Sequence, residues 1–283
     1  MRIRFVGSGD AFGSGGRGQT CIHLSAEGQA LLVDCGATSL VALKAQGLHP
    51  HAVGAVAVTH LHGDHFGGLP FLILDGQFSH RTAPLLVAGP PGTRVRLTEA
   101  METLFPGSSR AQRRFPVQVT ELAADGTPAK LGPATVRGWQ VEHACGAPPL
   151  ALRVDLGGAS FAYSGDTQWT PVLAKAARGA DLFAVGGLHL RPAYPLPPRL
   201  SDAAGPPRGD RRTPGRAHPH VRRHAQQARR RRTARSLRRH DHRPLTTPTW
   251  TGSSHLPVRK EIRGGSMGGR ADNAIRVLLG RKS

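Results

Sequence analysis

Apolar residues in the first 185 positions recur with the two-residue period of β-strands. The segment 2–6 alternates before a glycine turn, and the continuous apolar run 53–58 is typical of a buried strand. The same signals predict further strands at 21–24, 30–34, 84–88, 116–121, 134–141, 150–155, 159–163 and 181–185. This part of the chain is therefore built on short strands.

Helical segments separate these strands and are predicted at 38–46, 66–78, 93–105 and 170–177. Strands and helices follow one another in two successive sets. Because each sheet must bury an apolar face, this order predicts two sheets packed face to face with helices on the outer sides. The fold class expected for residues 1–185 is α/β.

The hydrophobic pattern stops after residue 185. Segment 192–207 is rich in proline, and 217–243 is rich in arginine and histidine; the next short apolar stretch is 274–279. The first part carries 15 Lys and Arg against 13 Asp and Glu, whereas 186–283 carries 23 against 5 and so holds +18 of the net charge of +20. We predict a folded domain followed by an Arg/Pro/His-rich, disordered part.

The densest chemistry lies in residues 60–65, between the apolar run and the second helix. His60 and His62 are two apart and point the same way in an extended segment, while Asp64 and His65 follow a glycine and can face a second point nearby. Imidazoles and a carboxylate suit zinc, with manganese and iron as alternatives. A histidine-rich loop arising by chance is the other interpretation, and the order of the pattern disfavours it.

This loop resembles the signature of the metallo-β-lactamase superfamily of binuclear metal hydrolases. The opening segment 2–10 (RIRFVGSGD), with Arg17 after it, resembles the ribonuclease Z (tRNA 3′-processing endonuclease) branch. The resemblance covers about residues 1–185. It implies the αββα sandwich of that superfamily, with an incomplete second half because the pattern stops early.

The resemblance also implies two divalent metal ions, whose ligands are His60, His62, Asp64, His65, His143 and Asp166. The first ion would take the three histidines at 60, 62 and 143. The second site would begin with the aspartate and histidine after Gly63, and Asp166 would bridge the two. His143 and Asp166 each follow a predicted strand, which is where the family carries its later motifs.

Two segments beside the metal loop have more than one interpretation. Asp34 ends the strand at 30–34, and in the family this strand end packs beside the metal loop, so a role in holding a ligand histidine is expected. The glycine-rich segment 7–18 either passes close to metals or a phosphate or is a plain connection.

The activity implied by the resemblance is metal-dependent hydrolysis of a phosphodiester, as in the processing of tRNA 3′ ends. Two metal ions would lower the pKa of a water molecule, and Asp64 would orient that water or take its proton. The segment 144–165 leaves no room for the long substrate-gripping arm of some relatives. The substrate is therefore RNA or a small phosphodiester, with a lactone or thioester as further alternatives, and family members often form homodimers.

The cysteines and the hydropathy of the chain indicate the cellular compartment of the protein. Cys21, Cys35 and Cys145 are odd in number and widely spaced, which predicts reduced thiols. No apolar run approaches the roughly 20 residues of a membrane-spanning helix, and the first residues lack the pattern of a signal peptide. A cytoplasmic protein is expected.

A one-base shift of the reading frame explains the change after residue 185. With GC-rich codons, the frame one base later turns 186–189 into Glu-Ala-Tyr-Thr, 217–221 into Leu-Thr-His-Met-Ser and 224–227 into Met-Leu-Ser-Lys. These segments resemble, in order, those that the family carries here, including the histidine that is the last metal ligand. We hypothesise that the chain from about Gly186 onward is an out-of-frame translation, which impairs activity.

Two other functions compete with a hydrolase. The basic part could bind nucleic acid through phosphate contacts without catalysis, although Trp250 is the single aromatic residue after Tyr194. Alternatively, the ancestor was an enzyme and this chain is a product without function.

Overall fold

The residues that the computed structural model describes are 1–186, 188–189, 249–251 and 276–279. The chain divides into two units, one formed by Met1–Ala193 with Thr247–Ser283 and one by Tyr194–Thr246. The second unit lies outside the described residues, as do the proline-rich and arginine-rich segments. Their predicted disorder therefore stays a prediction.

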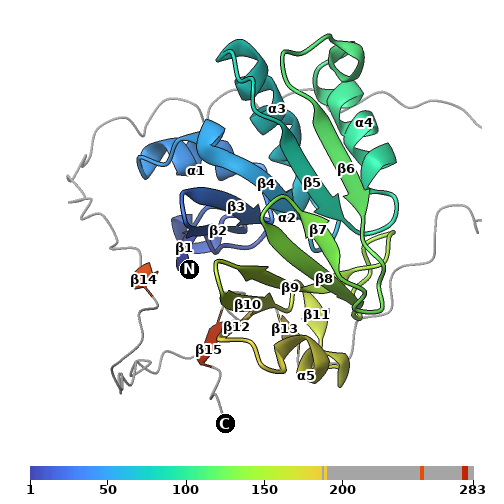
Figure 1. The fold of residues 1–283 in the computed structure, drawn as a ribbon. Coiled ribbons are helices and arrows are strands. Elements are labelled where there is room, and N and C mark those ends of the chain that lie inside the picture. Colours follow the sequence, from blue (N-terminus) through green and yellow to red (C-terminus); the bar gives the residue numbers. More distant parts are fainter. Residues whose placement is uncertain (187, 190–248, 252–275, 280–283) are drawn as a thin grey trace, which may run out of the picture. The chain divides into compact units, whose positions relative to one another are not determined.

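Two β-sheets form the described unit (Figure 1). The first has the order β14-β1-β2-β3-β4-β5-β6, with parallel pairing from β3 to β6. Its strands are β1 (Arg2–Gly7), β2 (Cys21–Ala26), β3 (Gln29–Val33), β4 (Val53–Ala57), β5 (Leu85–Gly89), β6 (Val117–Glu121) and β14 (Thr249–Thr251). Strand β4 lies between two parallel neighbours, which explains its continuous apolar sequence.

The second sheet has the order β15-β12-β10-β9-β8-β7. Its strands are β7 (Ala129–Leu131), β8 (Ala134–Gln140), β9 (Leu150–Leu156), β10 (Ala159–Tyr163), β12 (Leu182–Val185) and β15 (Arg276–Leu279). A separate parallel pair joins β11 (Thr167–Gln168) to β13 (Leu188–His189). The backbone of β15 pairs with β12, and that of β14 pairs with β1, so short pieces of the basic part add to both sheets.

Apolar side chains of both sheets meet in one core, for example Leu24 and Leu31 with Leu152 and Phe161. Helices cover the outer faces and are α1 (Ser39–Ala45), α2 (Gly63–Phe66), α3 (Leu69–Phe78), α4 (Thr93–Leu104) and α5 (Val172–Ala177). Helices α1, α3 and α4 pack on the first sheet and α5 on the second (Figure 1). The prediction of an α/β sandwich of two sheets with outer helices is confirmed.

The helix predicted at 66–78 occurs as α3 over Leu69–Phe78, and only its predicted start is wrong, because the preceding helix α2 ends at Phe66. Gly67 and Gly68 separate α2 from α3. A Cβ atom at Gly68 would collide with the carbonyl oxygen of Gly36, so the backbone approaches too closely for any other residue. The amide of Gly68 donates to the carbonyl oxygen of Cys35 at 2.8 Å. This contact docks the metal loop on the segment that follows β3.

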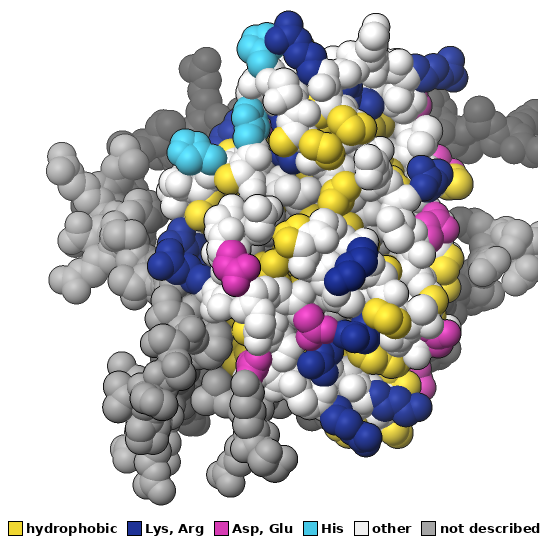
Figure 2. All heavy atoms as spheres, viewed as in Figure 1, with side chains coloured by type: hydrophobic (Ala, Val, Ile, Leu, Met, Phe, Trp, Pro, Cys, Tyr) yellow, Lys and Arg dark blue, Asp and Glu magenta, His cyan; other side chains and the backbone are white. Residues whose placement is uncertain are grey.

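Charges on the described unit are balanced. Figure 2 shows basic and acidic side chains interspersed over one face of this unit, in keeping with its near-neutral composition. Within the described residues, no helix is long and apolar enough to span a bilayer.

Candidate metal centre

Asp34 is the first residue after β3 and the anchor of the site. Its backbone is left-handed, with φ of 60°, a conformation that aspartate tolerates better than most residues. This turn directs the carboxylate, which is 0% exposed, toward the end of β4. There it accepts hydrogen bonds from the Thr59 amide at 2.8 Å and the Thr59 hydroxyl at 2.9 Å. Asp34 therefore fixes the start of the metal loop.

The hydroxyl of Thr59 passes this constraint on to His60. Because Thr59 Oγ1 donates its proton to Asp34, it must accept a hydrogen bond from His60 Nδ1, which lies 3.0 Å away. The proton of His60 is thus held on Nδ1, and Nε2 keeps its lone pair. Burial lowers the pKa of His60 to about 2, and the nearby charge of His65 adds to this, so the ring stays neutral.

His65 contacts Asp34 directly, as expected for a residue that holds a ligand histidine. Its Nδ1 lies 2.6 Å from Asp34 Oδ2, and its Nε2 lies 3.5 Å from both Asp64 and Asp166. Burial opposes a charge on His65, but the three carboxylates outweigh it and raise its pKa well above the usual value. The two ring nitrogens of His65 therefore have different functions. Nδ1 contacts Asp34 and orients the side chain, and Nε2 faces the pocket.

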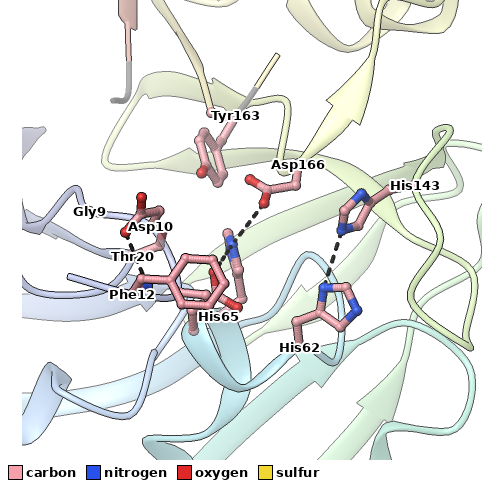
Figure 3. Close-up of a pocket in the computed structure, with 12 residues that line it drawn as sticks. Gly9, Asp10, Phe12, Thr20, His62, His65, His143, Tyr163 and Asp166 are labelled. Atoms are coloured by element: carbon pink, nitrogen blue, oxygen red, sulfur yellow. Dashed lines mark hydrogen bonds and ion pairs between the residues drawn. The ribbon is translucent and has the colours of Figure 1, made fainter. Parts of the chain in front are cut away.

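The second sheet contributes the remaining side chains. His143 follows β8, and its Nε2 lies 3.2 Å from Nδ1 of His62, which precedes α2 (Figure 3). Asp166 follows β10 after Gly165, whose φ of 61° allows the turn. Burial opposes the charge on Asp166, but a hydrogen bond from His65 and the nearby histidines lower its pKa. The candidate metal centre thus combines side chains that follow strands of both sheets.

All six side chains predicted from the sequence lie around one point. Ligand atoms of His60, His62 and His143 lie within 4.8 Å of one another, and so do those of His60, His65 and Asp166. Asp64 lines the same pocket. His60 is common to both groups, and its buried Nε2 has no hydrogen-bond partner among the described residues. An unpaired imidazole nitrogen inside a cluster of imidazoles and carboxylates fits a bound metal ion; which ion each residue holds stays a prediction.

The further residues that line the pocket had no place in the predicted site and include Asp10, Phe12, Thr20 and Tyr163. The first two belong to the glycine-rich segment, and one of its two interpretations was proximity to metals. Asp10 accepts hydrogen bonds from the amides of Phe12 and Ser14, which holds Phe12 at the rim (Figure 3). Tyr163 had one available signal, its position three residues before Asp166.

Comparisons with known proteins identify relatives of this arrangement. The family model of anti-Pycsar protein Apyc1 matches residues 1–183. Ribonuclease Z of Mycobacterium marinum is 32% identical over 192 residues, which are 64% of this chain and 68% of that protein. Ribonuclease Z of Salinibacter ruber is 41% identical over 110 residues, which are 37% of this chain and 33% of that protein. The chain therefore spans only a third of the latter relative.

Solved structures agree on the fold. Human tRNase Z, short form, covers 65% of this chain with 76% of its own, at a TM-score of 0.54 and 25% identity. The metallo-β-lactamase fold protein YhfI from Bacillus subtilis covers 64% of this chain with 69% of its own, at a TM-score of 0.51 and 19% identity. The chain belongs to the family that the Apyc1 model describes, within the ribonuclease Z-like branch of the metallo-β-lactamase superfamily.

Proposed function

We propose that this chain is a binuclear metal-dependent phosphodiesterase of the ribonuclease Z type. The observation that carries the proposal is the pair of three-residue ligand groups that share His60. Ribonuclease Z relatives support the choice of a phosphodiester over a lactone or thioester. Zinc is the proposed ion, with manganese and iron as alternatives, because the ligands are imidazole nitrogens and carboxylate oxygens.

Each predicted site residue has a proposed role. His60, His62 and His143 would hold one ion, and Asp64, His65 and Asp166 the other. When bound, two divalent ions supply an activated water molecule and stabilise charge on the attacked group. Asp64 is buried at the pocket and would orient the nucleophile and accept its proton. Asp34 would keep His65 and, through Thr59, His60 in the productive orientation.

RNA is the proposed substrate, and a small phosphodiester is the second candidate. The observation that supports the second candidate is the segment between His143 and Asp166, which holds the β9–β10 hairpin and no long arm. Phe12 is compatible with either substrate. Its side chain is 92% exposed at the pocket rim, where an aromatic ring can stack on a nucleobase.

Turnover of bis-p-nitrophenyl phosphate by the metal-supplemented protein tests the hydrolase. Activity should disappear in His62→Ala and persist in the matched control His49→Ala, whose histidine is exposed and outside the pocket. A protein that instead binds RNA equally well with and without His62, and hydrolyses nothing, would be the non-catalytic nucleic-acid binder. A precursor tRNA and a cyclic nucleotide, assayed side by side, separate the two substrate candidates.

We further propose that the segment after Val185 is out of frame and that the second metal site lacks its final histidine. The supporting observation is the change in sequence character and charge at this point. Sequencing the coding DNA around the Val185 codon tests the idea, and an unbroken frame shared with full-length relatives would refute it. Metal content by mass spectrometry should give fewer than two tightly held ions per chain, and a gene with the frame restored should give two.

Homodimerisation and a cytoplasmic location are parts of the same proposal. Light scattering coupled to size-exclusion chromatography measures the first, and fractionation of the source cell measures the second. A monomer at micromolar concentration would remove the dimer from the proposal without affecting the hydrolase.

A further inference from the structure

Tyr163 ends β10 with its ring in the core and its hydroxyl at the metal pocket. The side chain is 1% exposed and packs in the apolar layer between the two sheets. Its hydroxyl end shares the pocket with Asp64, His65 and Asp166, and Figure 3 shows the ring beside Asp166. The residue therefore joins the hydrophobic core to the site.

The Tyr163 hydroxyl has no hydrogen-bond partner among the described residues. Thr20 lies near it without reaching hydrogen-bond geometry. A buried hydroxyl without a partner destabilises a fold, because it has lost its hydrogen bonds to water. Packing alone does not require it, since Phe161, two residues earlier on the same strand, is fully buried without a hydroxyl. A ligand in the pocket would give this group the partner that the protein does not.

The other polar groups of the pocket indicate what that ligand needs. Asp10, Asp64 and Asp166 carry carboxylates, which accept hydrogen bonds when ionised and repel an anion. The lining histidines belong to the proposed metal ligands. Among the lining side chains only Thr20 and Tyr163 are neutral hydroxyl donors. A phenol is protonated at neutral pH and can donate to an anionic oxygen.

We infer that the Tyr163 hydroxyl donates a hydrogen bond to a phosphoryl oxygen of the bound substrate, which makes Tyr163 a substrate-binding residue. The inference rests on the proposed phosphodiesterase function. It assigns to the core strand β10 a direct contact with substrate, three residues before the predicted ligand Asp166. Hydrogen bonds to charged groups change affinity by about ten- to hundredfold.

Tyr163→Phe separates this function from a structural one. It keeps the ring and removes only the oxygen. The matched control is Tyr194→Phe, the same change at the other tyrosine of the chain, which lies outside the described residues. Three quantities are measured on metal-loaded full-length protein: the melting temperature, the Kd for inorganic phosphate by calorimetry, and kcat/KM for bis-p-nitrophenyl phosphate. Metal content by mass spectrometry is matched between variants.

The expected result is a melting temperature equal to or above that of the parent, with phosphate binding weakened at least tenfold and kcat/KM reduced similarly. A lower melting temperature in Tyr163→Phe would overturn the inference, because the hydroxyl would then have a partner inside the fold. Phosphate binding equal to that of the control would also overturn it, as would a parent protein that binds no phosphate. If the parent binds phosphate but hydrolyses nothing, the proposed function fails, while weaker binding in Tyr163→Phe still supports the inference.

Discussion

The two ligand groups share His60 but differ in how their other members are held. His65 is buried, and Asp34, itself fully buried, fixes it by a hydrogen bond of 2.6 Å. His62 and His143 are half-buried and come from loops of different sheets. Nε2 of His143 lies 3.2 Å from Nδ1 of His62. The first group is therefore organised by the protein before any ion binds. The geometry of the second depends more on the ion that fills it.

The two histidines of the first group, His60 and His65, differ in their protonation. The pKa of His60 is lowered to about 2, whereas the pKa of His65 is raised. His60 is a neutral ligand at any physiological pH. His65 must release a proton before it can bind a metal ion. Thus in the better organised group a metal ion must compete with the proton on His65.

The largest expected effect comes from removing His60, which is a member of both candidate ligand groups. His60→Ala should lower phosphodiesterase activity by about three orders of magnitude and remove the ion proposed for His60, His62 and His143, because Nε2 of His60 would be one of its three ligand atoms. Metal content by mass spectrometry and reporter hydrolysis check this. An unchanged metal content in His60→Ala would contradict this assignment.

The next effect tests the support of His65. Asp34→Asn preserves the shape of the side chain and the left-handed backbone but removes the charge. We expect metal affinity at the His65 group to fall by about 10- to 100-fold, measured by competition with a chelator. The control Asp10→Asn changes a pocket carboxylate that no predicted ligand contacts, and should leave affinity unchanged. An equal loss of metal affinity in Asp34→Asn and Asp10→Asn would contradict the specific support of His65 by Asp34.

Proton release measures the pH linkage directly. Zinc added to metal-free protein at pH 7 in weak buffer should release about one proton from His65, whose pKa is raised. Before metal is added, the protonated ring stabilises the fold below its unfolded pKa of roughly 6.5, and this stabilisation is lost as the pH rises through the folded pKa. Asp34→Asn should reduce the release. A pH-stat titration that detects no protons would mean that His65 is neutral.

The smallest effect concerns the pocket rim. Phe12→Ala should raise KM for a nucleotide substrate by about fivefold or more with kcat retained, because stacking contributes to binding and not to the chemical step. Phe78→Ala is the control, since Phe78 is similarly exposed at the end of α3 and outside the pocket. An unchanged KM would exclude Phe12 from substrate binding.

The sequence by itself determined the metal loop and the strand ends that meet it. Imidazoles and carboxylates at 60–65 require only local spacing, and His143 and Asp166 follow strands whose apolar pattern is visible in the sequence. The helix break at Gly67 and Gly68 was missed because it results from a close backbone approach to Gly36, which local propensity does not encode.

Tertiary structure decided which atoms of these residues face the pocket. The hydrogen bonds that Asp34 accepts from Thr59 and His65 join residues 25 and 31 positions apart, and the approach of β3 to β4 creates them. Likewise, a tyrosine in an apolar strand predicts a core residue, and only the packing of both sheets brings its hydroxyl to the metal pocket. Spacing along the chain predicts which residues are candidate ligands, whereas contacts between strands select their tautomers and neighbours, because these depend on distances that the local sequence does not fix.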